Sequence, residues 1–292
     1  MNKILIITLS NIGDAVMTTP VLEYLHKENP KYVFDIVCDK KTIEIFEHCP
    51  YLNKIYIKDK TKGFVGNINL IKALRKNFYE IAVDLRTDLF LFFLRANNKF
   101  FKIKNKKTHS VIKHFSALNV DIKKLPKQKI WIPSQIKSKI KKNYPKINGK
   151  ILALGIGANS EHKVWPTENF VSITKSLSTQ FKKIILLGDM RDRLRAQKFL
   201  NQYNKNVINL CGELSLIESA AFLEKSSIYI GNDSGLGHIS SALEIPTFII
   251  FGDEDSLRYH PWGANSHWLQ NKEKEISLIK PDLVLKKIKQ II

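Results

Sequence analysis

Residues 229–246 read YIGNDSGLGHISSALEIP, the pattern of a strand that passes into a helix. The apolar run is typical of a buried strand, a short polar turn follows, and a helix is expected to start near Leu236. Asp233 and His238 lie in this connection, which needs only one turn residue and one cap. A capped helix with a packed core histidine explains either residue singly, but it explains the whole set poorly.

The same stretch has the composition of an anion site. Helix N-termini bind anions through free backbone amides and a partial positive charge. Gly235 and Gly237 carry no side chains that would block a diphosphate, and Ser234 can donate a hydrogen bond. The stretch therefore predicts a diphosphate site at the start of a helix, with His238 pointing back at it.

The rest of the chain repeats this alternation of apolar strands and helical patterns. Strands are expected at KILIITL (3–9), VFDIVC (33–38), NKIYIK (53–58), IAVDL (81–85), KILALGIG (150–157), KKIILLGD (182–189), NVINLCG (206–212), SIYIGND (227–233) and PTFIIFG (246–252). Helices are expected at 14–29, 40–49, 70–79, 168–180, 192–203, 216–226, 236–244 and 281–292. Strands that alternate with helices predict parallel sheets covered on both faces.

A Lys-rich connector with several Pro residues interrupts the alternation near residues 122–150. The fold class expected is α/β: two Rossmann-like, doubly wound parallel-sheet domains, 1–148 and 149–292, that face a central cleft. In such sheets ligands bind at the carboxyl ends of the strands.

The charge is uneven. The 292 residues include 47 Lys and Arg against 27 Asp and Glu, a net charge of +20. Residues 95–113 carry seven basic side chains and residues 122–150 carry ten, with no acid in either segment. A positive surface of this kind attracts nucleic acid, anionic lipid or phosphorylated substrates. Compositional drift toward a solvated Lys surface explains the excess equally well.

The three cysteines, Cys38, Cys49 and Cys211, have no CxxC spacing. A disulfide framework or a zinc site is therefore not expected, and a reducing compartment is. The first apolar run is shorter than a signal-peptide core, and no run of 18 apolar residues occurs. The chain is expected to be neither secreted by this route nor integral to a membrane.

Two further loops follow expected strands. In TLSNIGDAV (8–16), Gly13 permits a tight turn and Asp14 stands at the start of a helix, where a simple N-cap is the alternative. In GIGANSEHKVWP (155–166), Gly155 and Gly157 let the backbone approach a ligand, and Lys163 is either a phosphate ligand or a solvated surface side chain. Trp165 is expected to anchor this second loop.

Taken together, SNIGDAVMTTP, HKVWP and GNDSGLGHISSALEIPTFIIFG, in this order, resemble the heptosyltransferase family of inverting GT-B glycosyltransferases. The resemblance extends from Lys3 to about Trp262. The D-S-G-L-x-H block is its most specific part, and the motif at Lys163 is supporting only.

The resemblance implies roles for individual residues. Asp14 matches a catalytic Asp that acts as general base, Lys163 matches a contact to the donor diphosphate, and Asp192 matches loosely an acidic residue that grips the ribose. Gly13 and Asn159 would shape their loops, although family members often carry hydroxyl residues where this chain has Ala158-Asn159. The donor-binding block falls on Asp233, Ser234, Gly235, Leu236 and His238.

The resemblance also implies an activity. The expected enzyme transfers a sugar, heptose from ADP-heptose, to a phosphorylated, lipid-linked lipopolysaccharide inner-core acceptor. The 1–148 domain would bind the acceptor and the 149–292 domain the nucleotide-sugar, without a metal or other cofactor. The expected location is the cytoplasm, peripheral on the inner face of the plasma membrane, where basic segments would meet anionic lipid.

Three alternatives stay open at this point. The donor or the acceptor can differ within the same family, and a sugar-nucleotide epimerase can share the architecture, although it would need further acidic residues in the cleft. A basic nucleic-acid-binding protein is the non-enzyme alternative. Apart from KFFKIK (99–104), however, the basic segments lack interleaved aromatic residues, so nucleic acid is not an expected partner.

Overall fold

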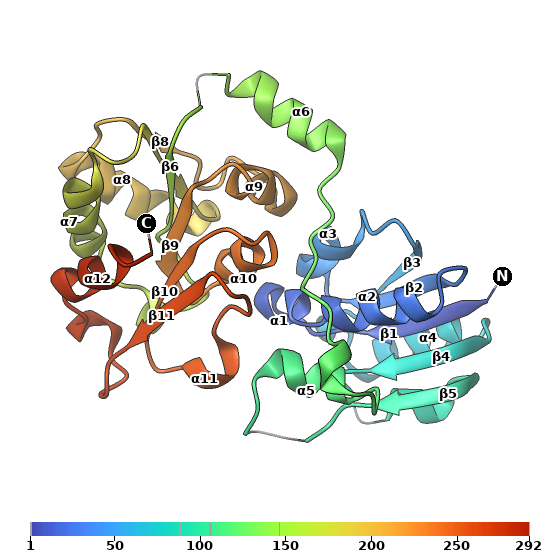
Figure 1. Ribbon diagram of the computed structural model, residues 1–292. Helices are drawn as coiled ribbons and strands as arrows, with labels where there is room; N and C mark the ends of the chain where they lie inside the picture. Colours follow the sequence, from blue (N-terminus) through green and yellow to red (C-terminus); the bar gives the residue numbers. More distant parts are fainter. Residues whose placement is uncertain (1, 88, 105–106, 146, 292) are drawn as a thin grey trace. The chain divides into compact units, whose positions relative to one another are not determined.

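The computed structural model describes residues 2–87, 89–104, 107–145 and 147–291. The chain divides into two compact units, residues 1–131 and 132–292. Each unit contains one parallel sheet with helices packed on it (Figure 1). The expected α/β class, with two doubly wound parallel-sheet domains, is confirmed.

The described part of the first unit forms a five-stranded parallel sheet in the order β3-β2-β1-β4-β5. Its strands are β1 (Lys3–Ile7), β2 (Val33–Cys38), β3 (Leu52–Ile57), β4 (Tyr79–Asp84) and β5 (Ala96–Phe101). Its helices are α1 (Ile12–Val16), α2 (Thr19–Glu28), η1 (Lys40–Thr42), α3 (Ile43–Phe46), η2 (Lys60–Lys62), α4 (Gly63–Leu74), η3 (Phe90–Phe93), α5 (Ser110–Ser116) and η4 (Ile122–Lys124).

The central strands of this sheet are largely apolar because both faces are covered. In β1, Ile4 to Ile7 are fully buried. In Figure 1, α2 and α5 lie in front of the sheet and α4 lies behind it. On one face α4 and the short helix η3 pack together, with Leu70 and Leu74 in the same core cluster as Phe90 and Leu91.

The described part of the second unit forms a six-stranded parallel sheet in the order β11-β10-β9-β6-β7-β8. Its strands are β6 (Ile151–Gly155), β7 (Lys183–Leu187), β8 (Val207–Asn209), β9 (Ile228–Asn232), β10 (Thr247–Phe251) and β11 (Ser266–Gln270). Its helices are α6 (Ser134–Asn143), η5 (Glu161–Lys163), α7 (Thr167–Leu177), η6 (Met190–Asp192), α8 (Arg193–Gln202), α9 (Leu216–Leu223), α10 (Gly235–Ala242), α11 (Ser256–Tyr259), η7 (Ile276–Leu278) and α12 (Pro281–Ile288).

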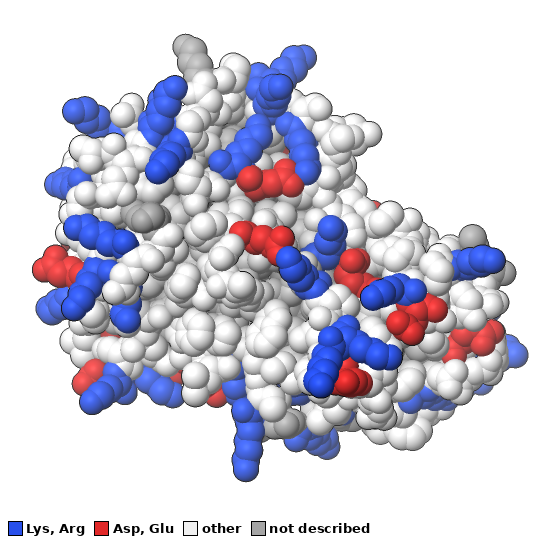
Figure 2. Space-filling model, viewed as in Figure 1, with Lys and Arg blue, Asp and Glu red and all other residues white. Residues whose placement is uncertain are grey.

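The division between the units lies at 131/132, earlier than the expected boundary at 148/149. The reason is α6, which belongs to the second unit because it packs on α9. The Tyr144 ring meets the Phe222 ring edge-on at 4.9 Å, and Lys137 and Lys139 form ion pairs with Glu224 and Glu218. Figure 2 shows the Lys side chains over α6 with acidic side chains beside them.

Both sheets reverse their strand order once. In the first sheet the order runs outward from β1 through β2 to β3 and restarts at β4; in the second it restarts at β9, next to β6. The carboxyl ends of the two strands at such a switch point diverge into different loops, and ligands bind there. Those loops carry Asp14 and Arg86 in the first unit, and Lys163 and Asp233 in the second.

None of the helices in the described parts of the chain combines the length and the apolar character needed to cross a membrane.

Candidate donor and catalytic sites

Lys163 and Asp233 meet at the switch point of the second sheet. Lys163 ends η5, and Asp233 directly follows β9. The Lys163 ammonium donates to Asp233 Oδ2 at 2.9 Å and pairs with Glu254 Oε1 at 2.9 Å. Three loops that are distant in sequence thus meet at one ammonium group.

Burial and pairing act on this cluster in opposite directions. Burial lowers the pKa of Lys163, but the two carboxylates outweigh it and raise that pKa above its ordinary value. Burial raises the pKa of Asp233 even though Lys163 pulls it down. Lys163 is therefore firmly cationic at neutral pH. An incoming diphosphate could take the place of Glu254, whose side chain is 42% exposed.

The start of α10 lies beside this pair. Ser234 is the N-cap residue with extended backbone, and the helix begins at Gly235, followed by Leu236. The first amides of a helix have no partner within the helix, so they are available to an anion. A Cβ atom at Gly237 would come within 2.6 Å of Ile249 Cδ1, so this glycine serves close packing against β10 as well.

His238 is buried in the first turn of α10. Burial lowers its pKa to about 4, with smaller contributions from His260 and Lys163, so the imidazole is neutral at pH 7. Its Nδ1 atom has no hydrogen-bond partner among the described residues. A neutral ring with an unused polar atom differs from a fully satisfied core histidine.

The glycines of the 155–166 loop make room for the protein's own side chains. A Cβ atom at Gly155 would lie 1.8 Å from Tyr229 Oη, and one at Gly157 would lie 2.1 Å from the Asp192 carboxyl group. Both glycines thus have a packing reason, and the expectation that they let the backbone approach a ligand stays a prediction. Asn159 lies in an exposed bend of this loop.

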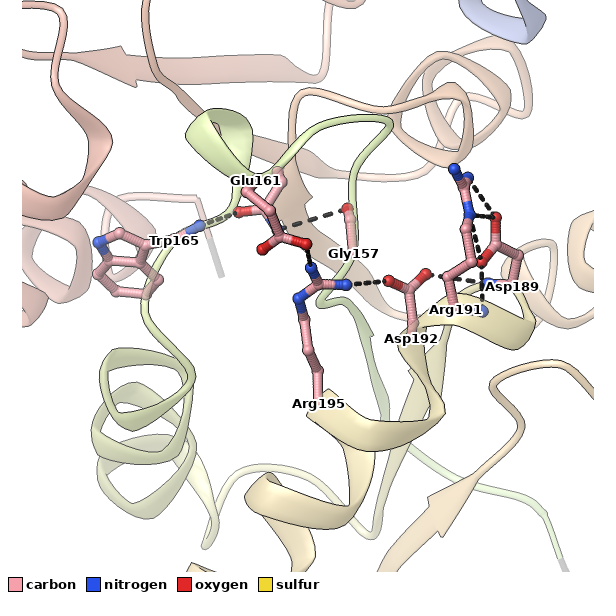
Figure 3. A network of polar contacts seen from close by, with 8 residues as sticks. Gly157, Glu161, Trp165, Asp189, Arg191, Asp192 and Arg195 are labelled. Atoms are coloured by element: carbon pink, nitrogen blue, oxygen red, sulfur yellow. Dashed lines mark hydrogen bonds and ion pairs between the residues drawn. The ribbon is translucent and has the colours of Figure 1, made fainter.

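Asp192 is the centre of a polar network (Figure 3). Its carboxylate accepts hydrogen bonds from the Asp189 amide at 3.0 Å and from Arg195 Nη1 at 2.8 Å. Arg195 also binds Glu161, the first residue of η5. Burial raises the pKa of Asp192. Arg195 thus connects the acidic residue after β7 with the short helix that carries Lys163.

Asn232 and Trp165 hold the same loop from the other side. The Asn232 side chain, fully buried at the end of β9, accepts from the Trp165 amide at 3.0 Å and donates to the Gly157 carbonyl at 3.4 Å. The Trp165 indole is buried and donates to the Ile279 carbonyl at 2.9 Å. Trp165 anchors the loop as expected, and α7 begins at Thr167.

In the first unit, Asp14 lies inside the first turn of α1, and Asn11 is the N-cap residue. Asn11 Nδ2 donates to Asp14 Oδ2 at 3.0 Å, and Lys41 Nζ donates to Asn11 Oδ1 at 3.2 Å. The simple N-cap alternative for Asp14 is wrong, because the helix begins two residues before it. Gly13 likewise lies within α1 and forms no turn.

Sequence reasoning missed Glu254, Asn232, Arg195 and Glu161. Glu254 follows β10, and Asn232 ends β9, inside the stretch that opened the sequence analysis. The rule that ligands meet the carboxyl ends of strands could have found both. Arg195 and Glu161 carried no signal, since a charged pair 34 positions apart is visible only in the fold.

Metal ligands do not gather in the described residues: no group of three or more His, Cys, Asp or Glu side chains could hold an ion there.

The family follows from a match over most of the chain. The model described as "Glycosyltransferase family 9 (heptosyltransferase)" matches residues 91–288. The chain belongs to glycosyltransferase family 9. It is therefore a glycosyltransferase of the heptosyltransferase family, as the resemblance implied. An epimerase and a nucleic-acid-binding protein are set aside as its main function.

The relatives agree with this assignment. The chain is 24% identical to lipopolysaccharide heptosyltransferase 3 of Escherichia coli K12, over 90% of this chain and 86% of the relative. Its fold matches the glycosyl transferase family 9 structure from Veillonella parvula at a TM-score of 0.87, with 19% identity over 99% and 97% of the chains. It also matches E. coli heptosyltransferase WaaC with ADP-2-deoxy-2-fluoro heptose at 0.77, with 20% identity over 99% of each chain.

Proposed function

We propose that this family 9 enzyme transfers a heptose from ADP-heptose to a lipopolysaccharide inner-core acceptor, with inversion at the anomeric carbon. The observation that carries the proposal is the partly buried Lys163–Asp233 pair at the N-terminus of α10. The names of the relatives support heptose, and the WaaC structure holds an ADP-heptose analogue. Another nucleotide-sugar or another surface-glycan acceptor is the alternative within the family.

Asp14 is the proposed general base. Its carboxylate takes the proton of the acceptor hydroxyl while that oxygen attacks the anomeric carbon. The bond from that carbon to the diphosphate breaks, and the electron pair leaves with ADP. A positioned base contributes about 10²- to 10⁴-fold. Asn11, itself held by Lys41, would keep the carboxylate oriented.

The leaving diphosphate needs compensation for its growing negative charge, which is usually the larger share of catalysis. Lys163 supplies a full charge, and the first amides of α10 supply hydrogen bonds and the positive end of the helix dipole. Neutral His238 can donate a hydrogen bond without adding charge. With these groups in place, the proposal includes no metal or other cofactor.

Asp192 is the proposed ribose contact. A carboxylate has about four lone-pair positions, and Asp192 uses two of them for Asp189 and Arg195. A ribose hydroxyl can donate to one that is left. Arg195 would transmit the position of the ribose to η5 through Glu161, so nucleotide and diphosphate contacts are mechanically linked.

The test is calorimetry with the purified protein, titrated with ADP-heptose and with UDP-, GDP- and CMP-sugars. We expect selective binding of ADP-heptose that weakens at least tenfold in Asp233→Ala, because Lys163 loses its buried partner. Asp14→Ala should keep the affinity and lose about 10²- to 10⁴-fold in transfer rate.

Asp282→Ala is the matched control, since it removes an exposed carboxylate at the start of α12 in the same unit. Selective binding of a different nucleotide-sugar would keep the transferase and discard heptose. Failure to bind any of the four would contradict the donor site.

A further inference from the structure

The carboxyl edge of the first sheet holds a guanidinium group that the protein itself does not satisfy. Arg86 follows β4, next to the switch point between β1 and β4. Its side chain is only 10% exposed, yet Nη1 and Nη2 make no hydrogen bond to any described residue. Arg86 forms one long ion pair with a described carboxylate: Asp39 Oδ2 is 4.0 Å from Nη2.

The adjacent acid is already occupied. Asp84, the last residue of β4, accepts hydrogen bonds from the Arg86 amide at 2.9 Å, from the Thr87 amide at 2.6 Å and from the Thr87 hydroxyl. Asp84 therefore caps its own loop and leaves the guanidinium donors unused. Buried charged donors without partners are costly, and native proteins seldom retain them without a use.

A second cation, Lys58, lies at the carboxyl end of another strand of this sheet. Lys58 directly follows β3, and its ammonium lies 3.9 Å from the centre of the Phe90 ring, with no ion pair to a described carboxylate. Burial, and then the charge of Arg86, lower the pKa of Lys58 to about 8. The two like charges repel each other, and an anion bound by both would offset this repulsion.

Arg86 and the proposed base Asp14 lie at the same edge of the first sheet. Asp14 and Asn11 follow β1, Lys41 follows β2, and Arg86 follows β4, so these side chains belong to one edge of the sheet around its switch point. Ligands of open α/β sheets bind at that point.

We propose that Arg86 and Lys58 form an anion subsite that takes a phosphate or carboxylate group. The planar fork of Arg86 matches either group with two parallel hydrogen bonds, and Lys58 adds a point charge. Assigning this anion to the sugar acceptor, with Asp14 beside its reacting hydroxyl, rests on the proposed function. The subsite itself does not.

The test uses the full chain, saturated with ADP so that the donor loops are occupied. Inorganic phosphate and, separately, acetate are titrated by calorimetry at constant ionic strength. We expect phosphate binding to weaken tenfold or more in Arg86→Gln and less in Arg86→Lys, which keeps the charge and loses the fork. Lys58→Gln should weaken binding as well. If acetate binding depends on Arg86 in the same way, the subsite accepts a carboxylate as well as a phosphate; if only phosphate binding does, the subsite selects a phosphate.

Arg75→Gln is the control, because it removes an exposed guanidinium just after α4. Equal phosphate affinity in Arg86→Gln and Arg75→Gln would overturn the subsite. Thermal unfolding without ligand separates a ligand role from a structural one: removing a buried charge whose only ion pair with a described residue, to Asp39, is long should leave the melting temperature unchanged or raise it. A clear drop with unchanged phosphate binding would assign Arg86 to the fold.

ADP binding in the same samples keeps the two proposals distinct. If the wild-type protein does not bind ADP, the donor site is contradicted, but phosphate binding by Arg86→Gln and Arg75→Gln can still be compared. Normal ADP binding with no phosphate subsite would contradict only this inference.

Discussion

The loop that carries Lys163 is shaped at the residue scale by two side chains that need empty space. Tyr229 points its hydroxyl past Gly155 and Gly231, 3.5 Å from Ser234 Oγ, and Asp192 places its carboxylate against Gly157. Each glycine is thus required by a neighbour and not by a backbone turn, since none of the three has positive φ. The glycines position the donor residues indirectly, through Tyr229 and Asp192.

A second effect at this scale concerns pH. His114 in α5 is buried and its pKa is lowered by burial to about 3, from an ordinary value near 6.5. The unfolded state binds the His114 proton more readily than the folded state does. The contribution of neutral His114 to the free energy of unfolding is therefore complete above pH 6.5 and is lost as the pH falls toward 3. At pH 5 the loss should be about 2 kcal/mol.

We therefore expect His114→Leu to flatten the acid side of the stability profile of the first unit, measured by denaturant unfolding between pH 7 and 4.5. His162→Leu is the control, because this histidine is exposed. An unchanged slope in His114→Leu would show that other groups govern the acid response.

At the element scale, the central strands could be predicted because they are buried on both faces and read as largely apolar runs. Of the edge strands, the sequence pattern indicates β3 and β8 but not β5 and β11. Strand β11 (SHWLQ) is only partly buried and mixes polar with apolar residues. The apolar run at 89–94 looks like a strand, but it forms η3, with Phe92 and Phe93 exposed.

Helix α6 was hidden by its composition. Its ten residues, SQIKSKIKKN, contain four Lys and fall within the Lys-rich segment that resembles a connector. The helical signal was Ile136 and Ile140, spaced by four, and Ile140 is the buried one. The Lys residues at 137 and 139 look solvated in sequence, yet they pair with α9 in the fold.

This packing predicts a local effect of Ile140→Ala. Removing a buried Ile side chain should cost about 2–4 kcal/mol, and the loss should appear in the second unit. Hydrogen exchange should speed up in α6 and α9 and stay unchanged in α2. Ile136→Ala is the milder control, since Ile136 is only partly buried. Faster exchange in α2 instead would return α6 to the first unit.

Some of the candidate site residues could be predicted from the sequence, and others could not. Asp14, Lys163, Asp192 and Asp233 could be chosen because each follows an apolar strand and matches a family motif, and their chemical roles stay predictions. Arg86 and Lys58 could not be chosen, because nothing local distinguishes them from the other 45 basic residues of the 47. What distinguishes them appears only in the fold: the Arg86 guanidinium is largely buried and its Nη atoms make no hydrogen bond to a described residue, and the Lys58 ammonium lies over the Phe90 ring.

At the scale of the whole molecule, the basic residues behind the net charge of +20 have different surroundings in the two units. Part of it is used within the second unit, where α6 pairs with α9. The first unit also exposes large apolar side chains: Leu89, Phe92 and Phe93 are 62%, 66% and 51% exposed, and Phe64 at the start of α4 is 77% exposed. The segments around η3 and α4 cover the same face, since their buried residues share one core cluster.

This combination leads us to propose that the first unit docks on an anionic bilayer, with these aromatic side chains entering the interface. Each nearby Lys or Arg adds about 1 kcal/mol toward anionic lipid, and burial of the apolar side chains adds to this free energy.

In flotation, the protein should rise with vesicles that contain anionic lipid and stay behind with zwitterionic ones. Salt at 0.5 M, roughly halving the screening length, should weaken binding. Phe92→Ser combined with Phe93→Ser should release it. Leu194→Ser, which removes an even more exposed apolar side chain from the second unit, should not. Equal flotation with both lipid types, or in both variants, would leave the apolar residues of η3 without a membrane role and assign the basic residues beside them to the acceptor alone.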